Sequence, residues 1–189
     1  RAAGYGLFVT WFPAFLEYRF ELDPADSGRM TMYPLLGVVV GALVGGVCVD
    51  RTLAATGSKR ISRSGLAVIV LATGSSMILL SSGASSATGL VMLMSAGSFC
   101  AGFSSPCSWA ATMDVAGRYT ALIVGAMNMA GTLGAFTMPV ALGYLIGDIR
   151  AAGGNWNHVI YFVAAIYLAA ALTWLALDPN DAVDSNGAQ

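Results

Sequence analysis

The chain has 189 residues, of which only 10% are charged, and a mean hydropathy of +0.71. A soluble domain carries about 25% charged residues, so this chain could not cover a water-facing surface, whereas a lipid-facing surface needs few charges. The net charge of −1 also disfavours a nucleic-acid partner, because a phosphate-binding surface needs a basic excess.

Six apolar stretches follow one another along the chain, separated by polar segments such as the charged loop expected at residues 17–29. About 20 apolar residues cross the hydrocarbon layer as a helix, so the pattern predicts an all-α integral membrane protein with six transmembrane helices. We expect the spans at residues 2–16, 30–49, 64–82, 88–113, 119–146 and 159–177. The first stretch is short and the chain begins with Arg1 rather than Met, so we expect a part of a longer polypeptide with its first helix truncated.

The second span carries Gly37, Gly41 and Gly45 at intervals of four residues, which return to nearly the same face of a helix. This face lacks side chains, so a neighbouring helix can approach its backbone closely. The fourth and fifth spans combine glycines with a proline, Pro106 or Pro139, which removes a backbone hydrogen bond and invites a kink. We expect close helix contacts, with the alternative that glycine is simply frequent in membrane helices.

The loop after the second span gathers Arg51, Lys59, Arg60 and Arg63, whereas the loops on the opposite side mix arginines with Asp and Glu. Cytoplasmic loops carry an excess of Lys and Arg, so we expect this end of the molecule in the cytoplasm. By alternation of the spans, the carboxyl tail lies on the same side. Residues 179–189 are acidic and poor in apolar side chains, and we expect them to be disordered.

Four segments together resemble the carboxyl-terminal half of a major facilitator superfamily transporter, and within it the anion:cation symporter family of hexuronate, galactonate and sialin-type carriers. The segment YGLFVTWFPAFL at 5–16 is similar to the seventh helix of that family, and GVCVDRTLAATGSKRISR at 46–63 to the loop between its helices eight and nine. GFSSPCSWAATMD at 102–114 is similar to helix ten, and GRYTALIVGAMNMAGTLGAFTMPVALGYL at 117–145 to helix eleven. Helix eleven of the family often reads GNLGG, where this chain has Thr132 and Ala135.

The resemblance implies that residues 1–178 form the six-helix transmembrane half, helices 7–12, of a secondary active transporter that works by alternating access. It implies a small organic anion such as a sugar acid as substrate, and a proton or sodium ion as coupling cation. The coupling carboxylates and the anion-binding Arg are implied to lie in the amino-terminal half, which we expect as a partner alongside the lipid bilayer. We expect no enzyme activity, no cofactor and no metal site, since the three cysteines lie in apolar runs without metal-site spacing.

In the loop motif, Gly46 lies one helical turn before Asp50 on the same face, so the end of a neighbouring helix can approach Asp50 there. Asp50 can accept hydrogen bonds from the N-terminal N–H groups of that helix. Arg51, Arg60 or Arg63 can pair with acidic groups across the cytoplasmic gap, and such pairs would keep that side closed.

The resemblance implies the same gating role for the whole motif, which includes Gly57. The alternative is that the charges only set the orientation in the membrane, because exposed ion pairs contribute only about 0–1 kcal/mol. Both interpretations stand for Lys59, Arg60 and Arg63. Further along the chain, Asp114 lies four residues before Arg118, which predicts a local ion pair.

Asn128 lies near the middle of the fifth span, where an uncharged polar side chain is costly unless it faces protein or water. Its amide can donate and accept hydrogen bonds, which suits a carboxylate or hydroxyl ligand. The resemblance implies that Ser105 and Asn128 match positions that contact substrate in sugar-acid carriers. Trp109, Tyr5 and Trp11 are candidate walls of the cavity. The alternative is that the polar residues join helices and the aromatics are core or interfacial anchors.

Two other functions would fit a six-helix membrane protein. An intramembrane serine hydrolase needs a nucleophilic Ser and a His on neighbouring helices, and the chain offers the GFSS segment that ends at Ser105 and a single histidine, His158. His158 lies at the exterior edge of the last span, far in depth from Ser105. A non-transporting scaffold on the same fold is the second alternative, since fold does not fix function.

Overall fold

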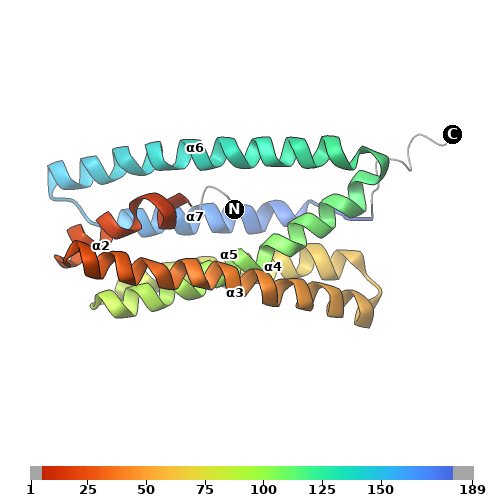
Figure 1. The fold of residues 1–189 in the computed structure, drawn as a ribbon, viewed down its shortest axis with the longest axis horizontal. Helices are drawn as coiled ribbons and strands as arrows, with labels where there is room; N and C mark the ends of the chain where they lie inside the picture. The colour runs from red at the N-terminus through yellow and green to blue at the C-terminus, as the bar shows by residue number, and fades with distance from the viewer. Residues whose placement is uncertain (1–5, 181–189) are drawn as a thin grey trace.

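The computed structural model describes residues 6–180, whose regular structure is helical throughout. The elements in chain order are η1 (Leu7–Trp11), α2 (Phe12–Phe20), α3 (Pro24–Thr56), η2 (Ile61–Gly65), α4 (Leu66–Leu80), η3 (Ser81–Gly83), α5 (Ala87–Ala116), η4 (Gly117–Tyr119), α6 (Thr120–Ala152) and α7 (Asn157–Leu175). Figure 1 shows the long helices side by side, with α5 running obliquely through the bundle toward the start of α6. The described parts of the six expected apolar stretches fall on helical segments, apart from residues 176–177 at the end of the last one, which follow α7.

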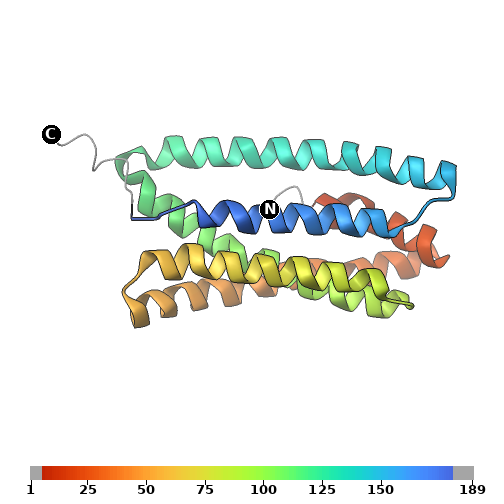
Figure 2. The same cartoon turned by 180° about the vertical axis from the view of Figure 1, so that it is seen from behind.

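Four helical stretches among the described residues are long and apolar enough to cross a membrane: 24–56, 61–83, 87–152 and 157–175. The third of these contains both α5 and α6, which the short turn η4 joins. Successive long helices run in opposite directions (Figures 1 and 2), so the connections gather at two ends of the bundle. The α3–η2 loop, η4 and the residues after α7 share one end, as the alternation of the predicted spans requires.

The charged loop expected at residues 17–29 is much shorter in the structure, because α2 continues to Phe20 and α3 begins at Pro24. Asp23 is extended and Pro24 occupies the first turn of α3, where its missing N–H costs nothing and its fixed φ suits a helix. Two side-chain contacts also stabilise the start of α3. Ser27 donates its hydroxyl to Oε1 of Glu17 at 2.8 Å, and Nη2 of Arg29 lies 2.6 Å from Oδ1 of Asp26.

Glycine allows α3 and α5 to pack backbone against backbone. A methyl group added at Gly37 would lie 2.8 Å from a backbone oxygen of α5, and one at Gly45 would lie 2.5 Å from that of Phe103. At Gly41 an added methyl group would meet the backbone oxygen of Phe99 still more closely. The close approach predicted from the glycine spacing is therefore confirmed, and a side chain on this face would have to push two helix backbones apart.

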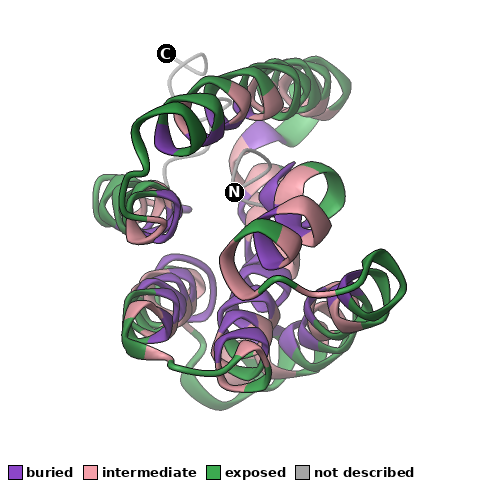
Figure 3. Cartoon of the chain, turned by 90° about the vertical axis from the view of Figure 1, so that its left-hand side faces the viewer, coloured by how far each residue is buried: buried purple, intermediate pink, exposed green. Residues whose placement is uncertain are grey.

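Buried aromatic residues of η1 and α2 belong to the larger hydrophobic core. The rings of Phe8 and Phe12 lie 5.3 Å apart, those of Phe12 and Phe15 lie 6.2 Å apart, and all three residues are fully buried. Figure 3 shows buried residues on the inward faces of the helices and exposed residues on the outward faces. Many outward residues are also apolar, such as Leu43 and Phe136, which are 70% and 73% exposed. Such a surface needs lipid or another protein against it.

The first half of α6 is more exposed than the second. Its four buried residues, Met138, Leu142, Ile146 and Ile149, all lie in the second half of the helix. They recur every three or four residues and so form one face, which packs toward η1 and α7. The first half, from residue 120 to residue 137, therefore borders open space within the part of the chain that the structure describes.

Candidate functional site

An open groove of about 430 Å³ lies between the second half of α5 and the first half of α6. Its lining residues are Ser108, Trp109, Met127, Asn128, Gly131, Thr132 and Ala135. None of these carries a charge, and the polar groups among them are hydroxyls, an indole and one amide. The groove can therefore offer hydrogen bonds to a ligand, but it cannot by itself neutralise an anionic one.

Asn128 is the most versatile of these groups and the one predicted from its depth in the fifth span. The residue is exposed on α6, and no described residue forms a hydrogen bond with its side-chain amide. The backbone oxygen of Asn128 accepts a hydrogen bond from the hydroxyl of Thr132 at 2.9 Å, and the spacing of four residues puts both side chains on one helix face. A buried helix-joining role would require a partner on another helix, so the geometry favours a free amide that faces the groove.

Ser105 does not line this groove, although it lies on the same helix as the residues that do. It is half-buried, one turn before Trp109, which lines the groove. The neighbouring hydroxyls are occupied within α5, since Ser104 donates to Ala101 at 2.8 Å and Ser108 donates to Ser104 at 3.1 Å. The substrate role of Ser105 therefore remains a prediction.

Of the two aromatic candidates from the first span, the structure describes only one. Tyr5 lies outside the described residues. Trp11 donates its indole N–H to the backbone oxygen of Pro139 at 2.9 Å, and a methyl group added at Gly143 would lie 3.1 Å from its ring. Trp11 thus fastens η1 to the second half of α6 and does not line the groove between α5 and α6.

Sequence reasoning did not select Thr132 and Met127, which complete the groove. Thr132 follows Asn128 by four residues, so the helical period alone could have placed it on the same face. Met127 is recognisable only from the fold, because its sulfur lies 3.3 Å from the hydroxyl of Thr112 on α5. A contact between two helices carries no local signal in the sequence.

The second cluster of interest is the charged end of the bundle. Nε of Arg63 lies 3.0 Å from Oδ2 of Asp114, and Nζ of Lys59 lies 3.1 Å from Oδ1 of the same carboxylate. The Arg63 side chain is only 8% exposed, and its Nη1 donates to the hydroxyl of Ser62 at 3.1 Å. Ser62 in turn donates to the backbone oxygen of Val49 at 2.6 Å. These contacts tie the ends of α3, η2 and α5 together.

A further pair extends this network to the end of α7. Nη1 of Arg60 lies 3.2 Å from Oδ2 of Asp178, and Ser64 donates its hydroxyl to the backbone oxygen of Leu177 at 2.9 Å. The pKa of Asp178 is lowered, chiefly by the hydrogen bond from the backbone N–H of Asn180 and also by Arg60. The carboxylate therefore stays ionised at neutral pH and remains available to Arg60.

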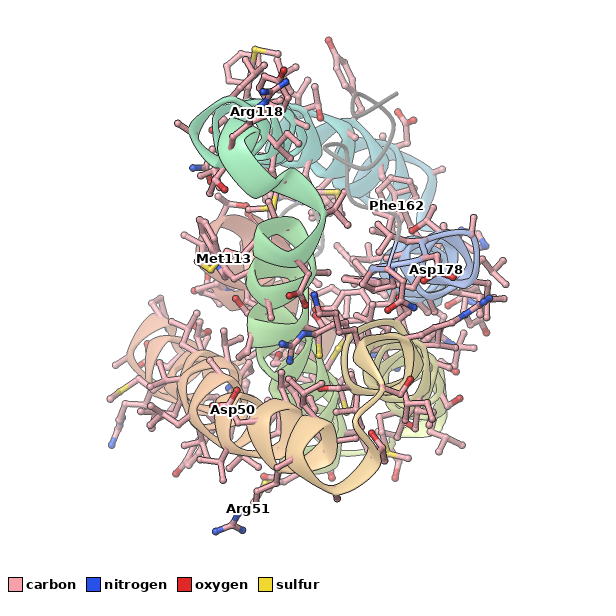
Figure 4. The ribbon with its side chains drawn as sticks, turned by 90° about the vertical axis from the view of Figure 1, so that its right-hand side faces the viewer. Asp50, Arg51, Met113, Arg118, Phe162 and Asp178 are labelled. Atoms are coloured by element: carbon pink, nitrogen blue, oxygen red, sulfur yellow. The ribbon has the colours of Figure 1, made fainter. Side chains whose placement is uncertain are left out.

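The positions of the predicted gating residues divide the loop motif into two groups. Arg60 and Arg63 pair with carboxylates of this chain, whereas Asp50 and Arg51 are exposed and form no ion pair with any described residue. Figure 4 shows Arg51 directed outward from α3, away from the rest of the bundle. Asp50 therefore remains available to an element outside the described residues.

The two glycines of the motif also differ from each other. A methyl group added at Gly46 would meet only Cγ of Pro106, at 4.0 Å, so this stretch of α3 lies open to an approaching helix. Gly57 ends α3 in the left-handed conformation, with φ +63°, which a side chain would disfavour. Gly57 thus sets the direction of the loop after α3, whereas Gly46 leaves its face of α3 without a side chain.

The ion pair predicted from the spacing of Asp114 and Arg118 is replaced by longer-range contacts. Asp114 pairs with Lys59 and Arg63, while Nη2 of Arg118 donates to the hydroxyl of Tyr119 at 2.8 Å. The turn at η4 separates Arg118 from the last turn of α5, so the spacing of four residues does not describe one continuous helix here.

Helices of membrane-spanning length and an open polar groove define a multi-pass membrane protein with a candidate transport site. The chain belongs to the Major Facilitator Superfamily, whose family model matches residues 2–189. The probable sulfoacetate transporter SauU of Cupriavidus necator is 28% identical to it over 179 residues, which are 95% of this chain and 41% of that protein.

Two further relatives give the same pattern. The probable galactarate/D-glucarate transporter GudP of Bacillus subtilis is 29% identical over 171 residues, covering 90% of this chain and 36% of the relative. The D-galactonate transporter of Escherichia coli O6:H1 is 29% identical over 171 residues, covering 90% and 38%. The chain thus spans about two fifths of the length of these curated relatives. The resemblance to part of a superfamily transporter with relatives among organic-anion carriers is confirmed.

Proposed function

We propose that residues 1–178 form the carboxyl-terminal lobe of a secondary active transporter that carries small organic anions, such as sugar acids, in symport with a proton or sodium ion. The observation that carries this proposal is the set of relatives, which are named as transporters of sulfoacetate, galactarate or D-glucarate, and D-galactonate. All these compounds are small carboxylates or sulfonates.

The groove between α5 and α6 supports a polyhydroxylated ligand. An amide can donate to one oxygen and accept from a hydroxyl at the same time, so Asn128 suits a sugar acid better than a purely apolar solute. The hydroxyl of Thr132 and the indole of Trp109 add to the same groove. Because the groove has no cationic lining residue, the proposal assigns the countercharge for the anion, and the coupling carboxylates, to an amino-terminal half of the same polypeptide.

The loop motif supports alternating access with two distinct tasks for its charges. The contacts of Asp114, Arg63 and Ser62 join the ends of α3, η2 and α5, and the separate pair Arg60–Asp178 joins the residues after α7 to the same end, so we expect these elements to move together. Asp50 and Arg51, which stand outside this network, are the groups that we assign to the gate between the two halves. Rocking of one half against the other about a central site is the general mechanism of such two-lobed transporters.

The charge distribution supports an orientation in the plasma, or inner, membrane with the α3–η2 loop in the cytoplasm. Arg51, Lys59, Arg60, Arg63 and Arg118 all lie at this end of the bundle, and basic residues near short loops remain on the cytoplasmic side. The same orientation puts the tail, residues 179–189, in the cytoplasm. Most of that tail, from residue 181 onward, lies outside the described residues.

The alternative of a serine hydrolase receives less support from the geometry. Ser105 lies inside the continuous helix α5, and no hydrogen bond joins it to His158 in the described part of the chain. His158 is exposed at the start of α7, where its ring lies 6.5 Å from that of Tyr161. A nucleophilic serine requires a base within hydrogen-bond reach.

Uptake by the full-length protein in proteoliposomes tests the proposal. Labelled galactonate, glucarate and sulfoacetate are offered with an inward proton gradient, an inward sodium gradient or no gradient. We expect at least one acid to accumulate, and one of the two gradients to accelerate its entry at least tenfold. Entry no faster than into protein-free liposomes would contradict transport of this class, and rapid entry that neither gradient changes would contradict symport alone.

A further inference from the structure

A second groove, of about 380 Å³, lies between the start of the η2–α4 helix and the end of α7. Its lining includes Arg60, Gly65, Val68, Ile69, Trp174 and Leu175. Figure 4 places α4 and α7 on the opposite side of α5 from α3. The groove is therefore separate from the candidate substrate groove, which involves α5 and α6.

The groove changes from cationic to apolar along its length. Arg60 stands at the loop end with its side chain 62% exposed, while Val68, Ile69 and Leu175 present only hydrocarbon. Ile69 follows Arg60 by nine positions, so at the α-helical rise of 1.5 Å per residue the two lie at most about 13.5 Å apart along the helix. One leaflet of a bilayer has a hydrocarbon depth of about 15 Å, so the groove matches the length of a lipid chain from its headgroup inward.

The donors at the loop end suit a phosphate ester. A guanidinium has five N–H donors in a planar fork, and the described residues give Arg60 one partner, Oδ2 of Asp178 at 3.2 Å from Nη1. The remaining edge of the fork can bind a phosphate oxygen. Trp174 is half-buried in the last turns of α7, a position typical of tryptophans at the membrane interface, and no described residue accepts a hydrogen bond from its indole N–H.

We propose that this groove binds one anionic phospholipid, with its phosphate on Arg60 and one acyl chain along Gly65, Ile69 and Leu175. Asp178 is the internal competitor of the phosphate, because its carboxylate already neutralises the charge of this guanidinium and repels a second anion beside it. Gly65 provides room for the chain, since a methyl group there would meet only the backbone oxygen of Arg60, at an unstrained 3.7 Å. The site does not require either half to transport anything, so it stands independently of the proposed function.

Native mass spectrometry of the full-length protein tests the site, with phosphatidylglycerol as the probe and phosphatidylethanolamine as the less anionic comparison. We expect preferential retention of phosphatidylglycerol, which Arg60→Gln reduces at least fivefold. Asp178→Asn removes the competitor and increases retention. Gly65→Leu fills the chain-binding part of the groove and reduces retention without changing any charge.

Arg29→Gln is the matched control, because Arg29 is also an exposed arginine that pairs with a carboxylate beside a groove, at the other end of the bundle. We expect it to retain phosphatidylglycerol as the wild type does. Equal retention by Arg60→Gln and the wild type would overturn the proposal, and so would an equal loss in Arg29→Gln, which would indicate unspecific attraction. Loss of a dimer rather than of lipid in Arg60→Gln would assign the groove to a second copy of the chain.

Discussion

Two kinds of polar side chain among the described residues differ in their role, those held in ion pairs and those open to a groove. Arg63 is almost fully buried, and its charge is matched by Asp114, which Lys59 also contacts. Asn128 is exposed, and no described residue engages its amide. The first kind holds helix ends together, and the second kind remains available to a ligand.

Asp114→Asn should lower the free energy of unfolding by about 3 kcal/mol, because removing one partner leaves the nearly buried charge of Arg63 uncompensated. Unfolding by added SDS in mixed micelles measures this loss. Asp26→Asn is the control, since it removes one partner of the exposed pair with Arg29, and such pairs contribute about 0–1 kcal/mol. Equal effects of the two substitutions would show that Asp114 does not stabilise the charged end.

Asn128→Ala should lower kcat/KM for uptake of the transported acid about tenfold, which corresponds to about 1.4 kcal/mol for one hydrogen bond to a charged or polar ligand. Thr137→Ala provides the control, because Thr137 is exposed on the same helix but its hydroxyl is engaged by backbone oxygens of that helix, those of Leu133 at 2.9 Å and Gly134 at 3.4 Å. Unchanged uptake by the Asn128 variant would remove this residue from the candidate site.

The sequence predicts single residues well where one helix decides their position. The depth and polarity of Asn128 indicated an accessible amide, and the helical period could have added Thr132. The partner of Arg63 could not be predicted in this way, because Asp114 lies 51 residues away and the pair depends on how η2 turns α4 against α5. The spacing rule gave the wrong partner for Asp114 because η4 interrupts the helix before Arg118.

At the scale of elements, the close contact between α3 and α5 is the feature that the sequence predicts most directly. Glycines at intervals of four predict a helix face without side chains, and in the structure the backbone of α5 packs against this face. The sequence alone does not identify that neighbour, because the fourth span has small residues on several faces. The length of α3 was also underestimated, because hydropathy marks only the membrane-spanning part of a helix and misses the polar first turns of α3.

Gly41→Ala should destabilise the protein by about 1–3 kcal/mol, because the added methyl group meets the backbone of Phe99, which cannot move without shifting α5. Gly28→Ala in the same helix should instead stabilise it by about 0.5–1 kcal/mol, since nothing lies within 4 Å of the new methyl group and Ala favours a helix. Opposite shifts of the thermal unfolding midpoint in detergent are the expected result. Shifts of the same sign would contradict the close α3–α5 contact.

At the scale of the whole molecule, the described residues carry much exposed apolar surface, which suits contact with lipid or with another protein element. The first half of α6 has no fully buried residue, and Asp50 and Arg51 form no ion pair with a described residue. Membership of the superfamily and the class of the relatives could be predicted from four sequence segments. The substrate and the coupling ion could not, because the residues that line the groove carry no charge.

Asp50→Asn should shift the full-length transporter toward states that are open to the cytoplasm, because it weakens the contact proposed to close that side. A cysteine placed in the groove should then react at least threefold faster with a membrane-impermeant thiol reagent applied from the cytoplasmic face. Asp148→Asn, an exposed acid at the opposite end of the bundle, should leave that rate unchanged. The same rate in all three proteins would argue against a gate at Asp50.

The most direct test of the two-lobed transporter is the accessibility of the groove from each side of the membrane. Asn128→Cys in the full-length protein is exposed to an impermeant thiol reagent in right-side-out and inside-out vesicles, with Cys48, Cys100 and Cys107 replaced by Ala to remove background. Alternating access predicts reaction from both sides, with the ratio of the two rates changed by the transported acid. Reaction from only one side, with or without the acid, would contradict it.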